Sequence, residues 1–439
     1  MDRDETVALF LQGREAWNAW AEKMLAERKA LEASGAWKSS QRFPSEPEKG
    51  ENPETQAWLD QAGVIFSRCL FLVRGAEGTK ETAGEDRESG EGSAPPVKSI
   101  QLRADRVDFA RFIFPGYANF RSATFTGNAG FRSAAFTGDA GFGSATFTGS
   151  ADFWGATFSD AGFESATFTR DAGFQSATFT GSAGFRSATF TGSADFRSAT
   201  FQNSTAFGEA KFLKEADFTG IKVERAFDMT GAAFKQVPAF NQADFKQAPD
   251  LDDVTFPPVS YWRGGKAKLA AQYRALRRMA IQGADYEREQ MAYKGELRAR
   301  RWTVDKWWAI GTWIGLFYDA FADCGRSIVR PAIAWCASIV LFAAFYWQQV
   351  AAGVEARCTE AGGAAVQALF LSVKNALVIF GGTRDARVNQ AYLCLYNGSA
   401  EQPHIPPTVT FVETLAQIPV SATLIFLFLL AVKNRFKIK

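Results

Sequence analysis

The residues best suited to chemistry are polar side chains that stand inside the apolar C-terminal third of the chain. They are Lys374, Asn375, Glu413, Gln417, Ser421 and Thr423, in two neighbouring apolar segments. Ionisable and amide side chains are costly in lipid, so such residues face one another or a water-filled pore. Groups of this kind suit the passage of ions. The alternatives are that Lys374 snorkels to the membrane interface and that Glu413 lies among lipid headgroups.

No grouping of residues has the spacing of a catalytic site. The single histidine, His404, stands close to Pro403 and Pro406, where a turn residue is the better interpretation. Gly264-Gly265-Lys266 lacks the flanking residues of a phosphate loop, and the sequence has neither a nucleophile elbow nor metal-ligand spacing. The sequence therefore predicts a protein that is not an enzyme, with no cofactor and no metal.

Charge and cysteine content exclude further classes. The 439 residues carry a formal net charge of +2, which gives no case for a nucleic-acid partner. The five cysteines are too scattered for a disulfide scaffold or a metal knuckle. The first residues lack the basic start and the apolar core of a signal peptide, which predicts that the front part stays in the cytoplasm.

Two segments of the predicted membrane domain, residues 302–439, are long and apolar enough to cross a membrane. They are residues 331–350, which contain no charged side chain, and residues 409–432. About twenty apolar residues are needed to cross about 30 Å of hydrocarbon. The alternative for each segment is a buried helix of a soluble protein.

Basic residues flank the two spans on the sides away from the loop between them. They are Arg326 and Arg330 before the first span, and Lys433, Arg435, Lys437 and Lys439 after the second. By the positive-inside rule, both termini then face the cytoplasm. Residues 302–321 are aromatic but are broken by glycines and Asp319, which predicts a helix lying in the membrane interface.

Residues 364–380, between the spans, are apolar but are interrupted by polar residues and followed by a glycine pair. A third crossing would place the basic tail on the wrong side, so a re-entrant helix is preferred. Irregular backbone at membrane depth needs cover from protein or water, which argues for a water-lined cavity. The pore or filter candidates are Phe380, Gly381, Gly382, Thr383 and Arg384, and Pro419 is the candidate hinge.

Cys358 and Cys394 bracket this short helix in the outer loop, and we predict a disulfide between them. The order of span, half-helix, glycine-containing turn and span resembles the two-helix pore-loop ion channels. The resemblance implies a homo-oligomer, a tetramer by analogy, with a pore built from residues 371–384 and the second span. The potassium filter Thr-x-Gly-Tyr-Gly is missing, so potassium selectivity is not implied, and Arg384 disfavours cations.

Residues 99–258 contain a repeat in which phenylalanine returns every five or six residues, with alanine two places earlier, as in Ala118/Phe120 and Ala123/Phe125. In an extended strand, residues two apart share a face, so both side chains point inward. The pattern predicts a stacked β-solenoid. An eleven-residue helical repeat is the alternative, but every unit contains glycine, which costs about 1 kcal/mol in a helix.

Segments such as Ala151-Asp152-Phe153-Trp154-Gly155 resemble the pentapeptide-repeat proteins. This resemblance implies a right-handed, quadrilateral β-helix with five residues on each side. We expect the extra residue of alternate units at corners, where Gly127, Gly138, Gly149, Gly181 and Gly192 stand. The expected result is about 22 residues per coil and about seven coils, given strands about 4.8 Å apart.

Three segments flank or interrupt the repeat. Residues 1–60 form an amphipathic helical cap, because solenoid edges need cover. Residues 61–98 supply a first-coil strand followed by a disordered insert rich in Gly, Glu and Ser. Residues 259–301 form a charged helical connector that covers the far end.

The whole chain resembles bacterial membrane proteins that join a pentapeptide-repeat domain to a pore-loop-like helix pair. The segments that carry this resemblance are residues 11–20, Tyr273-Arg274-Ala275-Leu276, Asp285-Tyr286-Glu287-Arg288-Glu289 and Ala431-Val432-Lys433-Asn434-Arg435-Phe436. It implies a multi-pass protein of the inner membrane. Two functions stay open: an oligomeric ion channel with a cytoplasmic domain for gating or partner binding, and a membrane-anchored interaction scaffold without conductance. The expected partners are membrane lipid, further copies of the chain and an unidentified cytoplasmic protein.

Overall fold

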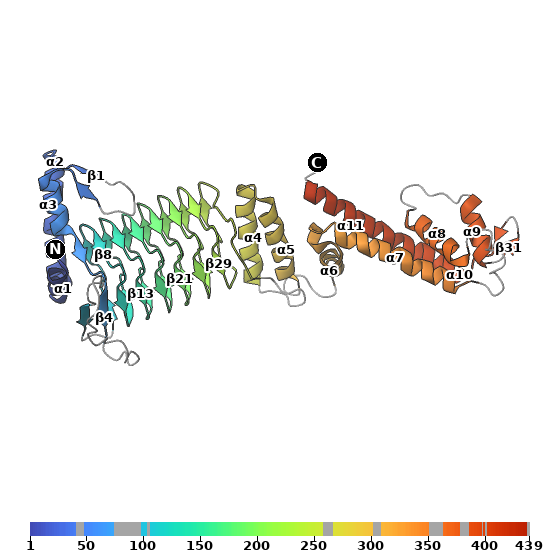
Figure 1. Ribbon diagram of the computed structural model, residues 1–439, viewed down its shortest axis with the longest axis horizontal. Coiled ribbons are helices and arrows are strands. Elements are labelled where there is room, and N and C mark those ends of the chain that lie inside the picture. The colour runs from blue at the N-terminus through green and yellow to red at the C-terminus, as the bar shows by residue number, and fades with distance from the viewer. Residues whose placement is uncertain are drawn as a thin grey trace, which may run out of the picture. The chain divides into compact units, whose positions relative to one another are not determined.

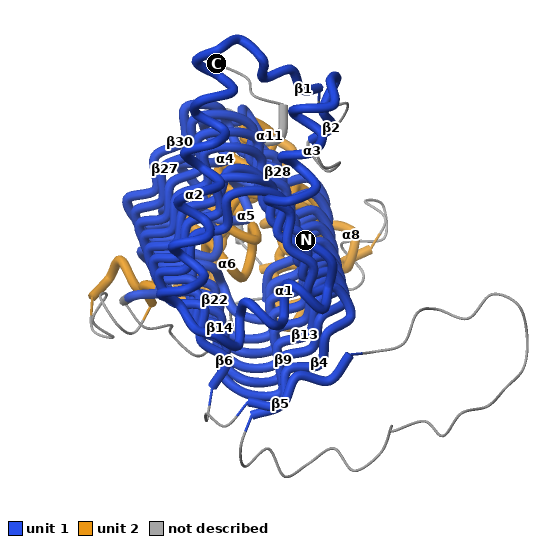
Figure 2. Tube along the Cα trace, turned by 90° about the vertical axis from the view of Figure 1, so that its left-hand side faces the viewer, with its two compact units in different colours: residues 1–299 blue, residues 300–439 orange. Residues whose placement is uncertain are grey.

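The computed structural model describes residues 1–40, 48–73, 98–102, 106–257, 267–301, 309–350, 363–377, 386–396, 398–399 and 402–436. The chain divides into two compact units, residues 1–299 and residues 300–439, which are coloured separately in Figure 2. Each unit is described by itself. The insert predicted before residue 98 lies outside the described residues.

A four-sided β-solenoid forms the centre of the first unit (Figure 1). Four parallel sheets of six, seven, seven and eight strands run along it. Paired residues in adjacent coils are 22 or 21 positions apart, as in Ala129↔Ala151 and Ala151↔Ala172. The predicted solenoid and its four sides are therefore confirmed.

The strands are short, and neighbouring strands of a sheet come mostly from successive coils. The first sheet contains β6 (Arg106–Asp108), β10 (Asn128–Gly130), β14 (Ala151–Asp152), β18 (Ala172–Gly173), β22 (Ala194–Asp195) and β26 (Ala216–Asp217). The second contains β7 (Ile113–Phe114), β11 (Ala135–Phe136), β15 (Thr157–Phe158), β19 (Thr178–Phe179), β23 (Thr200–Phe201), β27 (Lys222–Val223) and β30 (Asp244–Phe245). The third contains β3 (Val64–Ile65), β8 (Ala118–Asn119), β12 (Ala140–Gly141), β16 (Ala161–Gly162), β20 (Ala183–Gly184), β24 (Thr205–Ala206) and β28 (Phe227–Asp228). The fourth contains β5 (Lys98–Gln101), β4 (Cys69–Leu72), β9 (Thr124–Phe125), β13 (Thr146–Phe147), β17 (Thr167–Phe168), β21 (Thr189–Phe190), β25 (Lys211–Phe212) and β29 (Ala233–Phe234).

Columns of stacked phenylalanine rings fill the solenoid. In one column, Phe120, Phe142 and Phe163 follow one another with ring centroids 4.8 Å apart and ring planes nearly parallel. This distance equals the spacing of hydrogen-bonded strands, so the pairing that stacks the coils also stacks the rings. Rings of neighbouring columns meet edge to face, as Phe131 and Phe142 do at 5.5 Å, which is another favoured geometry for aromatic pairs.

Glycine stands at the corners because successive coils approach closely there. A Cβ on Gly149 would lie 2.3 Å from the carbonyl carbon of Gly127, and one on Gly192 would lie 2.2 Å from that of Arg170. The turns that follow alternate phenylalanines, such as Phe142, differ, because they need a left-handed residue and mostly hold serine, such as Ser144 with φ 56°. The corner glycines therefore serve packing, whereas the turn serines accept an unfavourable backbone region.

The N-terminal segment covers the first coil. It comprises α1 (Arg3–Leu11), α2 (Arg14–Ala33), the two-stranded sheet β1 (Ser39–Ser40) and β2 (Lys49–Gly50), and α3 (Pro53–Ala62). The indole of Trp17 donates to the carbonyl of Ile113 at 2.8 Å. Asn18 donates to the carbonyl of Arg111 at 2.9 Å and accepts from the amide of Ile113 at 3.1 Å. These side chains occupy backbone groups that an open strand edge would leave unpaired.

The far end of the solenoid is covered in the same way. Helix α4 (Ala267–Gln282) places Gln272 against the carbonyl of Val237 at 3.1 Å and Gln282 against that of Phe245 at 3.0 Å. Helix α5 (Tyr286–Arg300) follows, and its Arg288 pairs with Asp252 of the last coil at 3.0 Å. Both ends of the strand ladders are therefore occupied by side chains of the same protein.

The second unit is helical. Its elements are α6 (Ile310–Ala322), η1 (Asp323–Gly325), α7 (Val329–Gln348), α8 (Ala364–Ala376), α9 (Ala386–Tyr396), β31 (Gly398–Ser399), β32 (Gln402–Pro403), α10 (Pro407–Val412), the π-helical turn η4 (Glu413–Gln417) and α11 (Ile418–Phe436). Two stretches are long and apolar enough to cross a membrane, Val329–Gln348 and Pro407–Asn434. In Figure 1, α7 and α11 run side by side, and α8 packs against both. Helix α9 was not predicted, because its segment was assigned to a loop.

Changing Gly149 to alanine should destabilise the solenoid, because the added methyl group meets rigid backbone on the neighbouring coil. We expect Gly149→Ala to lower the free energy of unfolding by about 2 kcal/mol. The matched control is Gly143→Ala in the same coil, where a Cβ would have only ordinary contacts of 3.5 Å or more. Denaturant unfolding of the full chain in detergent, followed by the β-sheet signal in circular dichroism, measures both. Equal stability of the two variants would contradict the packing role of the corner.

Removing one capping side chain should loosen only the coil that it touches. Asn18→Leu removes two hydrogen bonds to the first coil, and Gln272→Leu removes one to the last coil. At about 1 kcal/mol for each bond, amide exchange in the adjacent coil should rise at least fivefold. Hydrogen-exchange mass spectrometry of the two variants provides reciprocal controls. Faster exchange along the whole solenoid in either variant would be inconsistent with local capping.

Candidate functional site

A cluster of buried polar side chains joins α7, α8, α9 and the π-helical turn in the second unit. It contains Tyr346 of α7, Ser372 and Asn375 of α8, Tyr392 and Tyr396 of α9, and Glu413 and Gln417 of the π-helical turn. All seven side chains are buried. Because this part of the protein is otherwise apolar, each polar group there needs a partner within the protein.

Gln417 lies at the centre of this cluster. Its side-chain nitrogen donates to the carbonyl oxygen of Ser372 at 2.8 Å and to the hydroxyl of Ser372 at 2.9 Å. Its side-chain oxygen accepts a hydrogen bond from the hydroxyl of Tyr346. The hydroxyl of Ser372 in turn donates to the carbonyl of Ile339 on α7 at 2.7 Å. One carboxamide therefore connects the second span to both the first span and the half-helix.

The remaining bonds extend the cluster to α9. The hydroxyl of Tyr392 donates to the carboxylate of Glu413 at 2.7 Å. The hydroxyl of Tyr396 donates to the carbonyl oxygen of Tyr346 at 3.1 Å. Asn375 donates to the hydroxyl of Tyr346 at 3.3 Å. The bond between Tyr392 and Glu413 joins α9 to the second span.

The spacing of Glu413 and Gln417 puts their side chains on the same side of the helix. The two residues are four apart, and Ser421 follows four residues later, so all three lie along the buried side of one helix. Pro419 is the second residue of α11, which follows the turn, and it has no amide hydrogen to donate. Wide turns of this kind inside helices are frequent at functional sites.

The other predicted polar residues differ in burial and in hydrogen bonding. Lys374 is half-buried on α8, next to the clustered Asn375. Ser421 is buried, and its hydroxyl has no hydrogen-bond partner among the described residues. Thr423 is exposed and donates back to the carbonyl of Pro419 at 2.8 Å, so it does not join the cluster. The predicted filter residues, Phe380, Gly381, Gly382, Thr383 and Arg384, lie outside the described residues.

The cysteines fall into two states. Cys394 is in a disulfide bond, whereas Cys69, Cys324 and Cys336 are free thiols. The predicted partner of Cys394, Cys358, lies outside the described residues. Cys394 belongs to α9, which packs against the half-helix α8.

Four members of the cluster were not predicted as site residues: Tyr346, Ser372, Tyr392 and Tyr396. Tyr346 is 1% exposed, whereas its neighbour Trp347 is 57% exposed. The signal that points to α9 is a helical spacing of residues that proved buried, namely Val388, Ala391, Tyr392, Leu395 and Tyr396. This spacing is visible in the sequence and predicts a helix with one buried face.

Chemically, the cluster places one carboxyl group and several amide and hydroxyl groups inside an apolar unit. The described residues contain no group of three His, Cys, Asp or Glu side chains that could hold a metal ion. His404 is exposed, away from the buried face of its segment. The arrangement suits polar contacts at membrane depth, which is how intramembrane ionisable residues are normally used.

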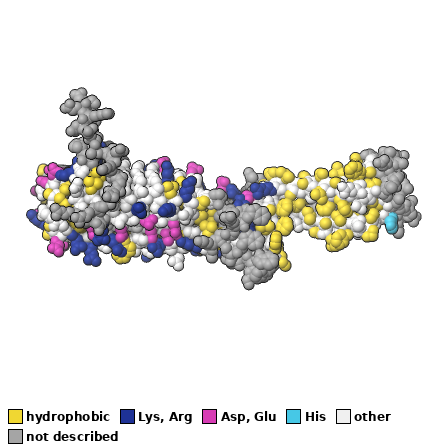
Figure 3. Space-filling model, turned by 90° about the horizontal axis from the view of Figure 1, so that it is seen from below, with side chains coloured by type: hydrophobic (Ala, Val, Ile, Leu, Met, Phe, Trp, Pro, Cys, Tyr) yellow, Lys and Arg dark blue, Asp and Glu magenta, His cyan; other side chains and the backbone are white. Residues whose placement is uncertain are grey.

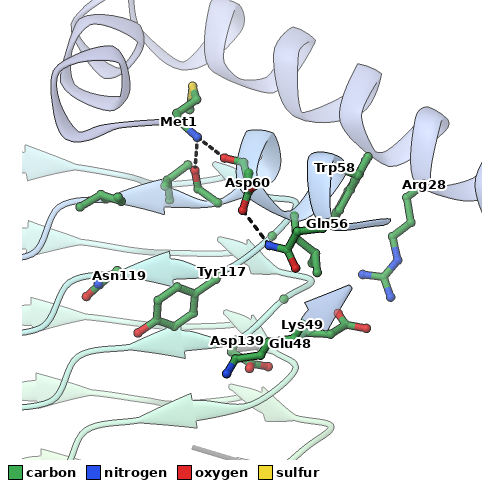
Figure 4. A pocket seen from close by; sticks show the side chains of 16 residues that line it. Met1, Arg28, Glu48, Lys49, Gln56, Trp58, Asp60, Tyr117, Asn119 and Asp139 are labelled. Carbon is green, nitrogen blue, oxygen red and sulfur yellow. Dashed lines mark hydrogen bonds between the residues drawn. The ribbon is translucent and has the colours of Figure 1, made fainter. Parts of the chain in front are cut away.

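A hollow of about 380 Å³ lies between the N-terminal helices and the first coils (Figure 4). Its wall carries both signs of charge, from Arg28, Lys49, Glu48 and Asp139. Burial, assisted by the carboxylates of Asp160 and Glu48, raises the pKa of Asp139 to about 7. A wall of mixed charge does not select one class of ligand, so this hollow supports no functional assignment.

Together, the two units define a β-solenoid protein that also has a helical region with two candidate membrane helices. A family described as Pentapeptide repeats (9 copies) matches residues 109–157 and 153–197, all within the solenoid. The chain therefore contains a pentapeptide-repeat solenoid, as its spacing predicts. Comparison with curated proteins and with solved structures gives no match.

Replacing Gln417 with leucine should destabilise the second unit strongly. The change keeps the size of the side chain but leaves the buried hydroxyls of Tyr346 and Ser372 without this partner. We expect Gln417→Leu to lower the free energy of unfolding by about 3 kcal/mol. Thr423→Val is the control, because an exposed hydroxyl bonded to its own helix should contribute less than about 0.5 kcal/mol. Thermal unfolding of the full chain in detergent compares them, and similar losses in both variants would refute the bridging role.

Proposed function

We propose that the chain forms an oligomeric, pore-loop-type ion channel with its solenoid in the cytoplasm. In this proposal the two long helices cross the membrane, and both termini lie on the cytoplasmic side. Helix α8 enters the membrane from the outer side as a re-entrant helix. The solenoid gates the pore or binds a cytoplasmic partner.

The observation that carries this proposal is the length and position of α8. Its 13 residues give about 20 Å of helix, which is too short for about 30 Å of hydrocarbon. It nevertheless packs against both spanning-length helices through Ser372 and Gln417. A helix that stops inside the membrane leaves backbone N–H and C=O groups that need hydrogen-bond partners from protein or water. A water-lined pore provides such partners.

The polar cluster gives this short helix a fixed position. Glu413 and Gln417 come from the second span, and their partners Tyr392 and Ser372 come from segments between the two spans. A re-entrant segment that lines a pore has to be held rigidly, because its position sets the width of the passage. The cluster therefore serves as the support for the proposed pore, and Glu413 is its one carboxyl group.

Several copies are needed for such a pore. In the part of the chain that the structure describes, one copy contributes two helices of spanning length and one half-helix, which do not enclose a passage. Within the two candidate spans, 17% and 33% of the residues in the most apolar window are buried, so most of their surface is left for lipid or for neighbouring copies. By analogy with the two-helix pore-loop channels, the proposed oligomer is a homotetramer.

The second candidate function is a membrane-anchored scaffold without conductance. The observation that favours it is the number of bonds within the polar cluster, since Gln417 uses both ends of its carboxamide inside the protein. A membrane anchor needs hydrogen-bond partners for its buried polar groups as much as a channel does. In this alternative, the sides of the solenoid bind a partner, because both of its ends are covered by the protein's own helices.

Conductance separates the two functions. We expect purified full-length protein in planar bilayers to give discrete single-channel currents. Arg384→Glu should raise the permeability for cations relative to anions by replacing a positive charge beside the turn, and Glu413→Gln should lower it. Lys211→Gln, an exposed change on the solenoid, should leave ion preference unaltered. Silent bilayers from a well-folded oligomer would reject the channel in favour of the anchor.

A further inference from the structure

The start of the first span and the end of the second meet in the second unit. A Cβ on Gly325, just before α7, would lie 2.6 Å from the side-chain nitrogen of Asn434, near the end of α11. Arg326 and Arg330 at the start of α7 and Lys433 at the end of α11 are therefore at the same end of the unit. All three are exposed. The structure thus gathers basic residues that are about one hundred positions apart in the sequence.

The acidic residues at this end are paired. Asp319 is fully buried and contacts Arg301 at 2.9 Å, and Arg301 is only 4% exposed. Asp323 lies 3.6 Å from Arg330. Asp323 thus offsets Arg330 in part, and the described side chains Arg326, Arg330, Lys433 and Asp323 together carry a net positive charge.

Helix α6 lies at the same end and presents an apolar face. Its exposed side chains are Ile310, Trp313, Ile314 and Phe317, which are between 48% and 77% exposed. Their spacing of three, four and seven residues puts them on one side of the helix. The opposite side contains the buried Thr312, Asp319 and Ala322. The helix is thus held by one side and leaves large apolar groups on the other.

We propose that α6, Arg326, Arg330 and Lys433 form a binding surface for anionic phospholipids. The apolar face of α6 lies at the boundary between headgroups and acyl chains, and the three cations bind the lipid phosphates. Arginine suits this role because its planar guanidinium forms two parallel bonds to phosphate. The inference rests on the membrane placement proposed above, but it does not depend on conduction.

Two observations favour lipid over other occupants. The start of the first span also exposes apolar residues, Val329 and Ile333, each 62% exposed. Figure 3 shows hydrophobic side chains spread widely over the surface of this unit. A soluble phosphate would use the cations but not this apolar surface. A second copy docked by the same surface would bring like charges together, which is unfavourable.

The test measures lipid affinity. Delipidated full-length protein is titrated with phosphatidylglycerol and, separately, with phosphatidylcholine, and bound lipid is counted by native mass spectrometry. The double variant Arg326→Gln/Lys433→Gln should bind phosphatidylglycerol at least tenfold more weakly, because each cation near the anionic surface contributes about fivefold. Its affinity for phosphatidylcholine should not change. Ile310→Ser/Phe317→Ser should weaken the binding of both lipids.

The control removes the same number of charges elsewhere. Lys211→Gln/Lys222→Gln, at exposed positions on the solenoid, should leave both affinities unchanged. Equal phosphatidylglycerol affinity in the wild type and in the Arg326/Lys433 variant would overturn the proposal. So would full competition by inorganic phosphate, which identifies a soluble anion as the ligand, or a change of oligomer mass in the Ile310/Phe317 variant, which identifies a second copy as the occupant.

Discussion

The hydrogen bonds of the Gln417 carboxamide are the constraint on which the arrangement of the helical unit depends. They tie the second span to Tyr346 of the first span and to Ser372 of the half-helix. In an apolar unit, burying a carboxamide without hydrogen-bond partners would cost several kcal/mol of stability. Few other arrangements of the helices would therefore satisfy this side chain. Helix α8 is consequently fixed between the spans. The proposed pore depends on that position.

The solenoid obeys the same rule of complete pairing by different means. Along its length, each coil pairs with the next, and the phenylalanine rings repeat with the strands at 4.8 Å. At its ends, Asn18 and Gln272 take the place of the missing strands. A solenoid closed in this way does not extend by adding another copy at its edge. Its sides remain as the surfaces through which a partner can act.

The solenoid was predictable because the sequence pattern that specifies it spans only a few residues. Each Ala and Phe two places apart identifies an inward face, and the glycine in every unit argues against a helix. Its four sides came from the resemblance to pentapeptide-repeat proteins, since spacing alone does not say how many turns close a coil. The handedness stays a prediction. The reason for glycine at positions such as Gly149 emerged only from the distance between stacked coils.

The polar cluster was predictable only in part. Glu413 and Gln417 were identifiable because polar residues in an apolar span are unusual, but their partners are set by tertiary packing. Tyr346 has the sequence context of an interfacial aromatic residue, and its burial depends on α8 and α9. The spacing of four residues between Glu413 and Gln417 predicts a shared helix face, but the sequence does not show that the turn containing them is π-helical.

The number of copies in the membrane tests the central claim most directly. Native mass spectrometry of the full-length protein released from nanodiscs, supported by cross-linking in intact membranes, gives this number without assuming any activity. The account predicts one closed homo-oligomer, with four copies expected. A protein that stays monomeric in the bilayer would contradict it, because two spans and one half-helix cannot enclose a pore.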